Sequence, residues 1–453
     1  MKIAVLGAGV AGLQTVDVLS SQGHECHVFD EKDGVGGVWK DNYDGYGLQV
    51  PFELYEFPRM PRPDLHGTFT DGDATLAYIR AYAESIQNCT WHMNERVVSV
   101  SQNDDMRWTL TTLKDTYEFE YCVMCTGMYS NPHVPSSLLG AVHSSEFRDA
   151  SITANRKVVV CGSGKSALDC AAAASRFASE THVYRRMRHW AIPQKLFGIV
   201  PFQWLAYSRL GHFLLPVHWY VSGRERFLHA LLSPLKYVIW RFVELCIMIH
   251  YGFSLYGSTR IEIDLFSGGQ IVPDSFTTLL HEKNVVLHDG EYDVDDAAVN
   301  EDTVVVAATG FIKTYDIFDD VTMNKLCVEM DGLWLYKNIV PPMVCNLAFI
   351  GSEITTFNNV LTQHLQAQWL SKNITFENAR SYLKASEMLR DVSTDQQWKR
   401  SWLPLSKYRA ASVQLHMLKY HDMLMDDMGV RAPCLRLMEW HLPLTVAHYV
   451  ERT

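Results

Sequence analysis

The stretch "KIAVLGAGVAGLQTVDVLSSQGHECHVFD" (residues 2–30) determines the fold class of this chain. It opens with an apolar run that predicts a buried strand, and a G-x-G-x-x-G motif follows as a tight turn. Residues 10–21 carry helical periodicity, and "CHVFD" predicts a second strand. The order strand, glycine turn, helix, strand predicts a βαβ unit in a parallel sheet. The motif glycines are Gly7, Gly9 and Gly12.

The same order of elements recurs in "RKVVVCGSGKSALDCAAAASRFASETHVYRR" (residues 156–186). An apolar strand leads into a G-x-G-x-x-A turn, a helix follows, and "THVYRR" predicts the next strand. The motif "GSGKS" is not a nucleotide triphosphatase loop, because that loop needs a glycine where Val159 stands. The residues of this second turn are Gly162, Gly164, Lys165, Ser166 and Ala167.

A glycine loop that opens a helix suits a pyrophosphate. The first glycine permits the turn, the second lets the phosphate approach the backbone, and the third allows close packing of helix on strand. Free N–H groups at the helix N-terminus then attract the anion. Because both loops lie between a strand and a helix, we expect two dinucleotide sites.

The residues that end the second strand of each unit distinguish the two ligands. Asp30 follows Gly7 by 23 residues, and Arg185 follows Gly162 by the same 23, with Arg186 beside it. A carboxylate accepts hydrogen bonds from ribose hydroxyls, whereas a guanidinium binds a 2′-phosphate. We therefore expect FAD at the first loop and NADPH at the second; a solvated basic strand end is the plainer alternative for the arginines.

Three further phrases favour FAD at the first site. In "DGVGGVW" (33–39), paired glycines permit a close approach of the backbone to a cofactor. Two buried strands end in Thr-Gly, at Thr126-Gly127 and Thr309-Gly310, where the chain is expected to cross between domains.

Composition restricts the class of partner. The chain has 453 residues, a formal net charge of −11 and 20% charged residues, so nucleic acid is not expected as a partner. The sequence shows neither a secretory signal nor a disulfide framework among its ten cysteines, so a cytoplasmic, reducing location is expected. No metal-binding motif is present, and no metal is expected.

We expect an α/β fold with two dinucleotide-binding Rossmann-like domains. Residues 1–152 and 316–453 are expected to form a discontinuous FAD domain, and residues 153–315 an inserted NADPH domain. Residues 197–256 predict an apolar helical insertion, and residues 376–453 a helical C-terminal tail. Charged residues interrupt the insertion, so it lacks the roughly 18 apolar residues of a membrane span. A buried helical insertion is the plain interpretation; a homodimer contact and peripheral membrane association are the alternatives.

Motifs along nearly the whole chain are similar to those of a known family. The sequence resembles the flavin-containing monooxygenases, which are class B flavoprotein monooxygenases, and the plant-type branch in particular. Besides the two glycine motifs, similar features are "GVGGVW" (34–39), "LQVPFELYEF" (48–57), "CTGMYSNPHVP" (125–135), "HSSEFRD" (143–149), "HLQAQW" (364–369) and "YHDMLMDDMG" (420–429).

Two departures from the family pattern are visible. The phenylalanine that opens the family signature before His143 is missing, and the spacing to that histidine is short. Many members place an asparagine beside the flavin in a phrase N-x-P-x-E, where this chain has Gln49. The longer amide side chain is expected to change the geometry of oxygen activation. We expect His143 to cap the crossover between domains by hydrogen bonding.

The resemblance implies a mechanism. NADPH reduces FAD, the reduced flavin takes up O₂ as a C4a-hydroperoxyflavin, and a small nitrogen or sulfur nucleophile, or a carbonyl compound, is oxygenated. Gln49 is the implied catalytic residue. The implied FAD contacts are Gly7, Gly9, Gly12, Asp30, Gly37, Val38, Trp39, Gln49, Val97, Thr126 and Gly127, and the implied NADPH contacts are Gly162, Gly164, Lys165, Ser166, Ala167, Arg185 and Arg186.

Two other functions stay open at this stage. A disulfide reductase also pairs FAD with NADPH, and Cys122-x-x-Cys125 is the only C-x-x-C in the chain. Residues three apart in a strand point to opposite faces, so these cysteines are expected to be structural thiols. A non-catalytic flavin sensor would fit if Gln49 abolished oxygen activation.

Overall fold

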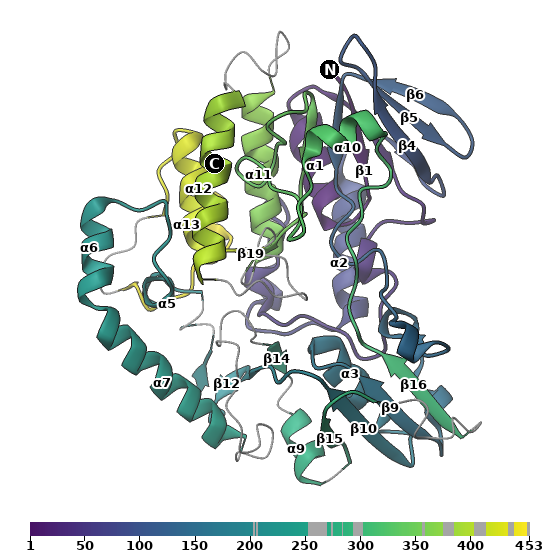
Figure 1. Cartoon of the computed structure of the whole chain (residues 1–453), viewed down its shortest axis with the longest axis vertical. Helices are drawn as coiled ribbons and strands as arrows, with labels where there is room; N and C mark the ends of the chain where they lie inside the picture. Colours follow the sequence, from purple (N-terminus) through teal and green to yellow (C-terminus); the bar gives the residue numbers. More distant parts are fainter. Residues whose placement is uncertain are drawn as a thin grey trace.

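The computed structural model describes residues 1–202, 204, 207–251, 270–272, 275–282, 284–292, 302–355, 358–374, 385–402, 414–433 and 439–450. Two α/β domains lie one above the other, and helices of the insertion and of the C-terminal tail flank them on one side (Figure 1). The predicted α/β class with two Rossmann-like units is confirmed.

The first domain is built on a five-stranded parallel sheet with the order β17–β7–β1–β2–β3. The strand bounds are Lys2–Leu6 (β1), Glu25–Phe29 (β2), Cys89–His92 (β3), Tyr121–Met124 (β7) and Leu347–Phe349 (β17). In β1, Ile3 and Val5 belong to one apolar cluster, while Ala4 and Leu6 belong to another. Because both faces of this strand are covered, it reads as a continuous apolar run.

Helices cover one face of this sheet and a small second sheet covers the other. Helix α1 (Val10–Ser21) packs against α11 (Asn359–Asn373), which follows β17 late in the chain. Across the sheet, Trp108 and Phe119 of a three-stranded antiparallel sheet share a cluster with Leu6. That small sheet contains β4 (Val97–Gln102), β5 (Trp108–Thr112) and β6 (Thr116–Phe119). Helices from distant parts of the chain, α1 and α11, thus pack together beside this sheet.

The second domain repeats the plan with the strand order β15–β10–β9–β16–β8, again all parallel. The bounds are Val142–His143 (β8), Lys157–Cys161 (β9), Glu180–Arg185 (β10), Val286–Asp289 (β15) and Thr303–Ala307 (β16), with helix α3 at Lys165–Ala174. Strand β8 precedes the predicted start of this domain at residue 153. Its pairing with β16 corrects that boundary: backbone hydrogen bonds place residues 142–143 in the second sheet.

The insertion is helical, as predicted, but it starts with a small hairpin of β12 (Lys195–Leu196) and β13 (Val200–Pro201). Helices α5 (Arg209–Leu214), α6 (Gly223–Leu231) and α7 (Ser233–His250) follow. The last predicted residues of the insertion, 252–256, lie outside the described part of the chain. Within that part, no helix is long and apolar enough to cross a membrane.

The insertion rests on the tail helices α12 (Ala385–Trp402) and α13 (Met417–Asp427). Arg209 forms a bidentate ion pair with Asp422, at 2.6 and 2.8 Å, and Trp219 Nε1 donates to Asp395 at 2.9 Å. The tail also carries α14 (Ala447–Val450) and a short strand β19 (Gln414–Leu415) that pairs with β18 (Ile354–Thr355). Insertion and tail are therefore one layer beside both sheets (Figure 1).

Candidate active site

Two glycines of the first loop have no room for a side chain. Gly7 has φ +111°, and a Cβ there would lie 2.4 Å from the carbonyl oxygen of Cys125. A Cβ on Gly12 would lie 1.8 Å from the carbonyl oxygen of Gly7. The turn and the close approach of α1 to β1 therefore both require glycine.

The "DGVGGVW" phrase lies directly against this loop. The Gly36 amide donates to the carbonyl oxygen of Ala8 at 3.0 Å, and a Cβ built on Gly37 would lie 3.0 Å from the Cα of Gly9. Two backbone segments without side chains thus meet at the N-terminus of α1. This is the surface that a dinucleotide pyrophosphate needs, because free amides and a positive helix end lie there.

Asp30 directly follows β2 and faces the same loop. Its carboxylate accepts hydrogen bonds from the amides of Ala8, at 2.7 Å, and of Lys32, at 2.9 Å. A carboxylate at this point next to a glycine loop suits ribose hydroxyl groups. Val97 lies farther along the chain, at the start of β4, where it packs on the cluster around Leu6.

Gln49 lies on a segment that is joined by hydrogen bonds to the "DGVGGVW" segment (residues 33–39). Trp39 Nε1 donates to the Tyr55 hydroxyl at 2.7 Å, and the Tyr46 hydroxyl donates to the carbonyl oxygen of Trp39. Between these two tyrosines, Gln49 is exposed while its neighbours Leu48 and Val50 are buried. Val38 is likewise partly exposed. The Gln49 amide is therefore presented outward beside the first loop.

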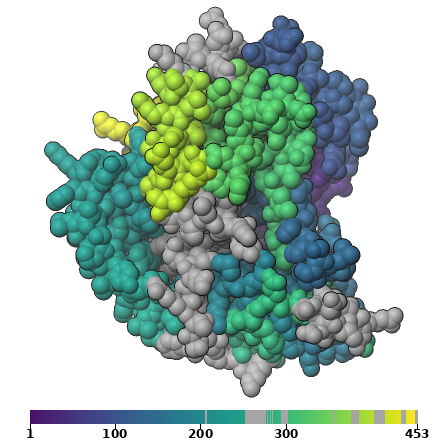
Figure 2. Space-filling model, viewed as in Figure 1, coloured from purple at the N-terminus to yellow at the C-terminus, as the bar shows by residue number. Residues whose placement is uncertain are grey.

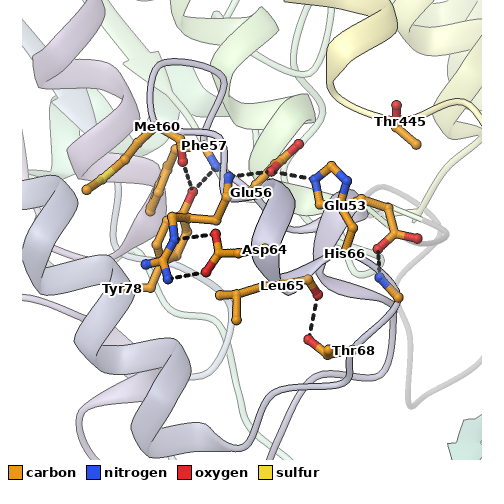
Figure 3. Close-up of polar contacts among 12 residues, drawn as sticks. Glu53, Glu56, Phe57, Met60, Asp64, Leu65, His66, Thr68, Tyr78 and Thr445 are labelled. Carbon is orange, nitrogen blue, oxygen red and sulfur yellow. Dashed lines mark hydrogen bonds and ion pairs between the residues drawn. The ribbon is translucent and has the colours of Figure 1, made fainter.

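The segment after Gln49 folds back on itself through polar contacts (Figure 3). Glu53 accepts from the Gly67 amide at 2.7 Å, and the buried carboxylate of Glu56 accepts from the Arg62 amide at 3.0 Å. His66 Nε2 lies 3.1 Å from the same Glu56 carboxylate. These contacts stabilise the loop that follows Gln49.

A third segment, which was not predicted as part of the site, also lies beside the first loop. A Cβ on Gly351 would lie 2.6 Å from the Cβ of Ala11, so the end of β17 touches the first turn of α1. Ser352 Oγ, Glu353 Oε2 and Gln363 Oε1 are buried here without a hydrogen-bond partner among the described residues. Unused hydrogen-bonding capacity inside a fold is what a polar cofactor such as FAD requires. The signal in the sequence was "FIGSE", another buried strand that ends in glycine.

Burial changes the pKa of two ionisable side chains near the first loop, Glu353 of this segment and Lys313 of the second crossover. It raises the pKa of Glu353 to about 7, because the charged form loses its hydration. It lowers the pKa of Lys313 to about 8 for the same reason. Lys313 Nζ donates to Thr126 Oγ1 at 2.8 Å and also to the Gly127 carbonyl oxygen, so it fastens the first Thr-Gly pair to the second crossover.

The second glycine loop has the same geometry as the first. The Gly162 amide donates to the Tyr184 carbonyl oxygen at 2.9 Å, as the Gly7 amide does to Phe29 at 2.8 Å. A Cβ on Gly162 would lie 2.3 Å from the carbonyl oxygen of Ala308. A Cβ on Gly164, by contrast, meets no described atom within 4 Å. The loop is closed toward the sheet and open at the N-terminus of α3.

The arginines at and just after the end of β10 have two different surroundings. Arg185 is buried, and its Nε donates to Asp289 Oδ1 at 2.8 Å. Arg186 points outward, and its Nη1 lies 3.4 Å from Glu291. Arg188, which was not among the predicted NADPH contacts, donates to both carboxylate oxygens of Asp289. The structure therefore groups Arg185 with Arg188, and hydrogen bonds from Arg188 and Arg185 lower the pKa of Asp289.

Lys165 of the second loop is linked to the first domain through Asp169. Its Nζ forms an ion pair with Asp169 one turn later in α3, and the Tyr43 hydroxyl donates to the same carboxylate at 2.9 Å. Burial raises the pKa of Asp169, whereas Lys165 and Tyr43 stabilise its charged form. Ser166 and Ala167 complete the first turn of α3, with Ala167 fully buried.

The two crossovers between the domains run side by side. The Ile312 amide donates to the Asn131 carbonyl oxygen at 2.9 Å, and the His133 amide donates to the Gly310 carbonyl oxygen at 2.9 Å. His143 Nε2 lies 3.0 Å from the same Gly310 oxygen, which confirms the predicted cap. Both cofactor loops are therefore attached to one double-stranded connection.

The C-x-x-C pair is structural, as predicted. Cys122 packs in the cluster around Leu6, whereas Cys125 packs in the cluster around Ile3 and Val5 on the other face of the sheet. Both thiols are free and buried, and burial raises the pKa of each, that of Cys125 to about 12. Neither thiol is a reactive nucleophile at neutral pH.

Comparison with known proteins identifies the family. The profile of the family described as flavin-binding monooxygenase-like (FMO-like) matches residues 1–226 and 267–448. The chain belongs to this family. As a member, it is a flavoprotein oxidoreductase: an NADPH-dependent flavin monooxygenase that binds FAD and NADP(H).

Relatives of this FMO-like protein are similar to nearly the whole of this chain. Flavin-containing monooxygenase 3 of Rattus norvegicus is 24% identical over 479 residues, which cover 96% of this chain and 84% of the relative. The putative dimethylaniline monooxygenase [N-oxide-forming] 6 of Homo sapiens is 24% identical, with 98% and 86% covered.

Solved structures share the fold of this FMO-like protein at low sequence identity. The S-allyl-L-cysteine S-oxygenase of Allium sativum is 18% identical with a TM-score of 0.62, and the match covers 96% of this chain and 90% of that one. An oxidised steroid monooxygenase bound to NADP is 17% identical with a TM-score of 0.68, and 95% and 98% are covered.

Proposed function

We propose that the protein uses NADPH and O₂ to oxygenate a small molecule at a soft nitrogen or sulfur atom, or at a carbonyl group. The observation that carries this proposal is the pair of glycine loops with opposite charges at the ends of their second strands. Asp30 stands beside the first loop and Arg185 beside the second, and the Tyr43–Asp169–Lys165 contacts join the two domains between them.

The first loop and its neighbours would hold FAD. The glycines of the loop and Gly37 provide a backbone surface for the pyrophosphate, and Asp30 provides acceptors for the ribose. Thr126 and Gly127 lie at the crossover, where Lys313 fixes them. To the residues that the resemblance implied we add Gly351, Ser352 and Glu353 of the third segment, because their unpaired buried atoms lie next to α1.

The second loop would hold NADPH. Gly164 leaves space for the pyrophosphate at the N-terminus of α3, and Arg185 lies at the strand end where the 2′-phosphate is expected. Bound FAD supplies the redox and oxygen chemistry; the chain orients both cofactors, keeps water out and offers polar groups. We assign Gln49 to the reacting end, because its exposed amide lies on the segment that Trp39 fastens to the first loop.

We propose a cytoplasmic protein that associates with a second copy or with a membrane surface through the insertion at residues 197–256. The support is the number of exposed apolar side chains on its helices, among them Phe227, Leu235 and Phe242.

One experiment tests the proposed activity. The purified protein should show a yellow flavin spectrum and should oxidise NADPH with matching O₂ uptake when a thioether, an amine or a ketone is supplied. The oxygenated product is then identified by mass spectrometry.

The same assay separates the two rival functions. Dithiol-dependent turnover without O₂ uptake, abolished by Cys125→Ala, would support a disulfide reductase. A bound flavin that NADPH fails to reduce would support a sensor. Full activity in Cys122→Ala and Cys125→Ala is expected, because these thiols lie on opposite faces of the sheet.

A further inference from the structure

The outer edge of the first sheet carries a row of polar and aromatic contacts across β2 and β3. His27 Nε2 lies 3.0 Å from Glu25 Oε1, and His27 Nδ1 lies 3.1 Å from His92 Nε2. The ring of His92 stacks on that of Phe29, its partner in the strand register, with the ring centres 4.3 Å apart. Asp30 follows Phe29 directly. This row of side chains therefore leads to the level of the sheet at which a ribose is expected.

An equivalent row lies in the second sheet, across β10 and β15. His182 Nε2 lies 3.2 Å from Glu180 Oε2, and His182 Nδ1 lies 2.9 Å from His288 Nε2. The ring of His288 stacks on that of Tyr184, its partner in the register, with the ring centres 4.5 Å apart. The two sheets thus correspond residue by residue at this edge, independently of the glycine motifs.

The correspondence ends at the next residue of each strand. The first sheet continues with Asp30 and Met93, an acidic and an apolar residue. The second continues with Arg185 and Asp289, which are partners in the register and form an ion pair with 2.8 Å between Arg185 Nε and Asp289 Oδ1. The first site therefore places a carboxylate at the level of the ribose, whereas the second site places both a guanidinium group and a carboxylate there.

The carboxylate of Asp289 is both charged and accessible. Hydrogen bonds from Arg188 and Arg185 lower its pKa, so it is ionised at neutral pH. Its side chain exposes 46% of its surface, compared with 10% for Arg185 and 17% for Arg188. The second domain forms the lower end of the molecule (Figure 1), and its atoms, blue to green, lie at the surface there (Figure 2). Of these three charged groups, Asp289 is the one that a ligand reaches most easily.

This carboxylate acts in opposite ways on the two nicotinamide dinucleotides. Guanidinium groups bind carboxylates and phosphates through the same N–H groups. A 2′-phosphate bound by Arg185 and Arg188 therefore competes with Asp289 for donors, and the two anions also repel each other. A free 2′-hydroxyl group, by contrast, donates a hydrogen bond to a carboxylate. Asp289 should thus weaken the binding of NADPH and strengthen the binding of NADH.

We propose that the second site accepts NADH as well as NADPH, and that Asp289 determines the preference between them. With NADPH, Arg185 and Arg188 bind the 2′-phosphate; with NADH, Asp289 accepts the hydrogen bond of the 2′-hydroxyl group. The hydride that FAD receives is the same in both cases, and the dinucleotide leaves as NADP⁺ or NAD⁺. This proposal rests on the proposed function, because it takes the second loop to bind a nicotinamide dinucleotide.

A purely structural role of Asp289 is the alternative. In that case the carboxylate only holds the two guanidinium groups in place, and its removal weakens the binding of NADPH more than that of NADH. The two roles therefore predict changes of opposite sign for the same substitution.

The test is the affinity of the full-length, FAD-loaded protein for NADP⁺ and NAD⁺, measured by isothermal titration calorimetry without turnover. We expect the native protein to bind both, with NAD⁺ at most about 100-fold weaker. Asp289→Asn should weaken NAD⁺ binding about tenfold, because a neutral amide is a poorer acceptor than a carboxylate. It should tighten NADP⁺ binding about threefold, because a like charge is removed from beside the phosphate. The KM values for NADH and NADPH should shift in the same two directions.

Two further variants are the controls. Glu291→Gln removes an acidic side chain that is 72% exposed and lies 3.4 Å from Arg186, so both affinities should stay within about twofold of the native values. Asp289→Glu keeps the negative charge and should retain more of the NAD⁺ affinity than Asp289→Asn. Circular dichroism and flavin content show that each variant is folded.

The possible contrary results have different meanings. An equal or larger loss of affinity for NADP⁺ than for NAD⁺ in Asp289→Asn would show that Asp289 only holds the arginines. A native protein that binds NADP⁺ but not NAD⁺ at millimolar concentration would exclude NADH as a cofactor. Both results would overturn the inference and leave the proposed monooxygenase function intact. Failure to bind either dinucleotide would instead contradict the second site and, with it, the proposed function.

Discussion

Arg185 Nε lies 2.8 Å from Asp289 Oδ1, and Arg188 donates to the same carboxylate. Asp289 ends β15, the neighbour of β10 in the sheet, so the two guanidinium groups are positioned by a residue about a hundred positions later in the chain. Arg186, adjacent in sequence, is directed to Glu291 instead. The phosphate-binding pair that the geometry favours is therefore Arg185 with Arg188.

This pairing leads to a prediction about cofactor preference. Arg185→Gln and Arg188→Gln should each raise the KM for NADPH by about 10- to 100-fold, because a charge-assisted hydrogen bond contributes about 1.5–3 kcal/mol. The KM for NADH should change little, since NADH lacks the 2′-phosphate. Steady-state kinetics with both cofactors measure the difference.

Arg186→Gln is the matched control for these two variants. It removes the same charge from the same strand end, but its side chain points away from Asp289, so the KM for NADPH should change less than about threefold. A larger effect of Arg186→Gln than of Arg188→Gln would show that Arg186, and not Arg188, binds the 2′-phosphate together with Arg185.

The two glycine loops predict opposite results for the same substitution. Gly12→Ala should prevent FAD binding and destabilise the protein, because its Cβ would overlap the Gly7 carbonyl oxygen. Gly164→Ala should fold normally and keep its FAD, because its Cβ meets no described atom within 4 Å. It should instead weaken NADPH binding, since the methyl group projects where the phosphate is expected.

Flavin content per chain, thermal unfolding and NADPH titration distinguish these outcomes. If Gly164→Ala bound NADPH as tightly as the native protein, the N-terminus of α3 would not be the pyrophosphate site. A Gly12→Ala protein that was stable and yellow would contradict the role assigned to the first loop.

Glu353 gives a prediction about pH. Burial raises its pKa from an ordinary 4.5 to about 7, so the folded protein holds a proton that the unfolded chain has lost. Its contribution to stability is therefore greatest below pH 4.5, and it is lost as the pH rises through 7. Glu353→Gln removes this dependence and should raise the free energy of unfolding at pH 8 by up to about 3 kcal/mol relative to the native protein.

The measurement is the midpoint of thermal unfolding of both proteins at pH 5 and pH 8. The advantage of Glu353→Gln should be larger at pH 8 than at pH 5. An advantage that is the same at both pH values, or is reversed, would show that Glu353 is ionised in the folded protein.

The contact between the domains can be tested at Tyr43. Tyr43→Phe removes the hydrogen bond to Asp169 and leaves Lys165 as its only described side-chain partner. We expect the KM for NADPH to rise about fivefold, in line with one hydrogen bond of about 1 kcal/mol, while flavin content stays unchanged. A loss of flavin with an unchanged KM for NADPH would show that the Tyr43–Asp169 hydrogen bond supports the FAD site and not the NADPH site.

The two βαβ units could be predicted because their information is local. A glycine motif between an apolar strand and a helix requires one backbone geometry, and the structure reproduces it at Gly7 and at Gly162. The positions of Asp30 and Arg185 beside the two loops could be predicted from their spacing for the same reason. Both residues end strands that pair directly with the strand before the loop.

Features that depend on distant pairings could not be predicted. The role of Arg188 becomes visible only when β15 brings Asp289 beside β10. Glu353 looks like any acidic residue after a strand until α11 and α1 bury it. The sequence showed that the insertion is apolar, but a helix with two apolar faces does not indicate which face the body of the protein covers.

The paired crossovers have a consequence for how this architecture is built. Asn131 leaves the first domain and Ile312 returns to it, and their backbones are joined by a hydrogen bond of 2.9 Å. The intervening 180 residues thus begin and end at one point, like a module fitted into a complete host fold. Joining residues 131 and 312 by a short linker would close the host chain, but it would also remove the insertion that contacts α12 and α13 through Trp219 and Arg209, so the flavin unit by itself is expected to be less stable. A separate nicotinamide unit would have to start before residue 142, since β8 is part of its sheet.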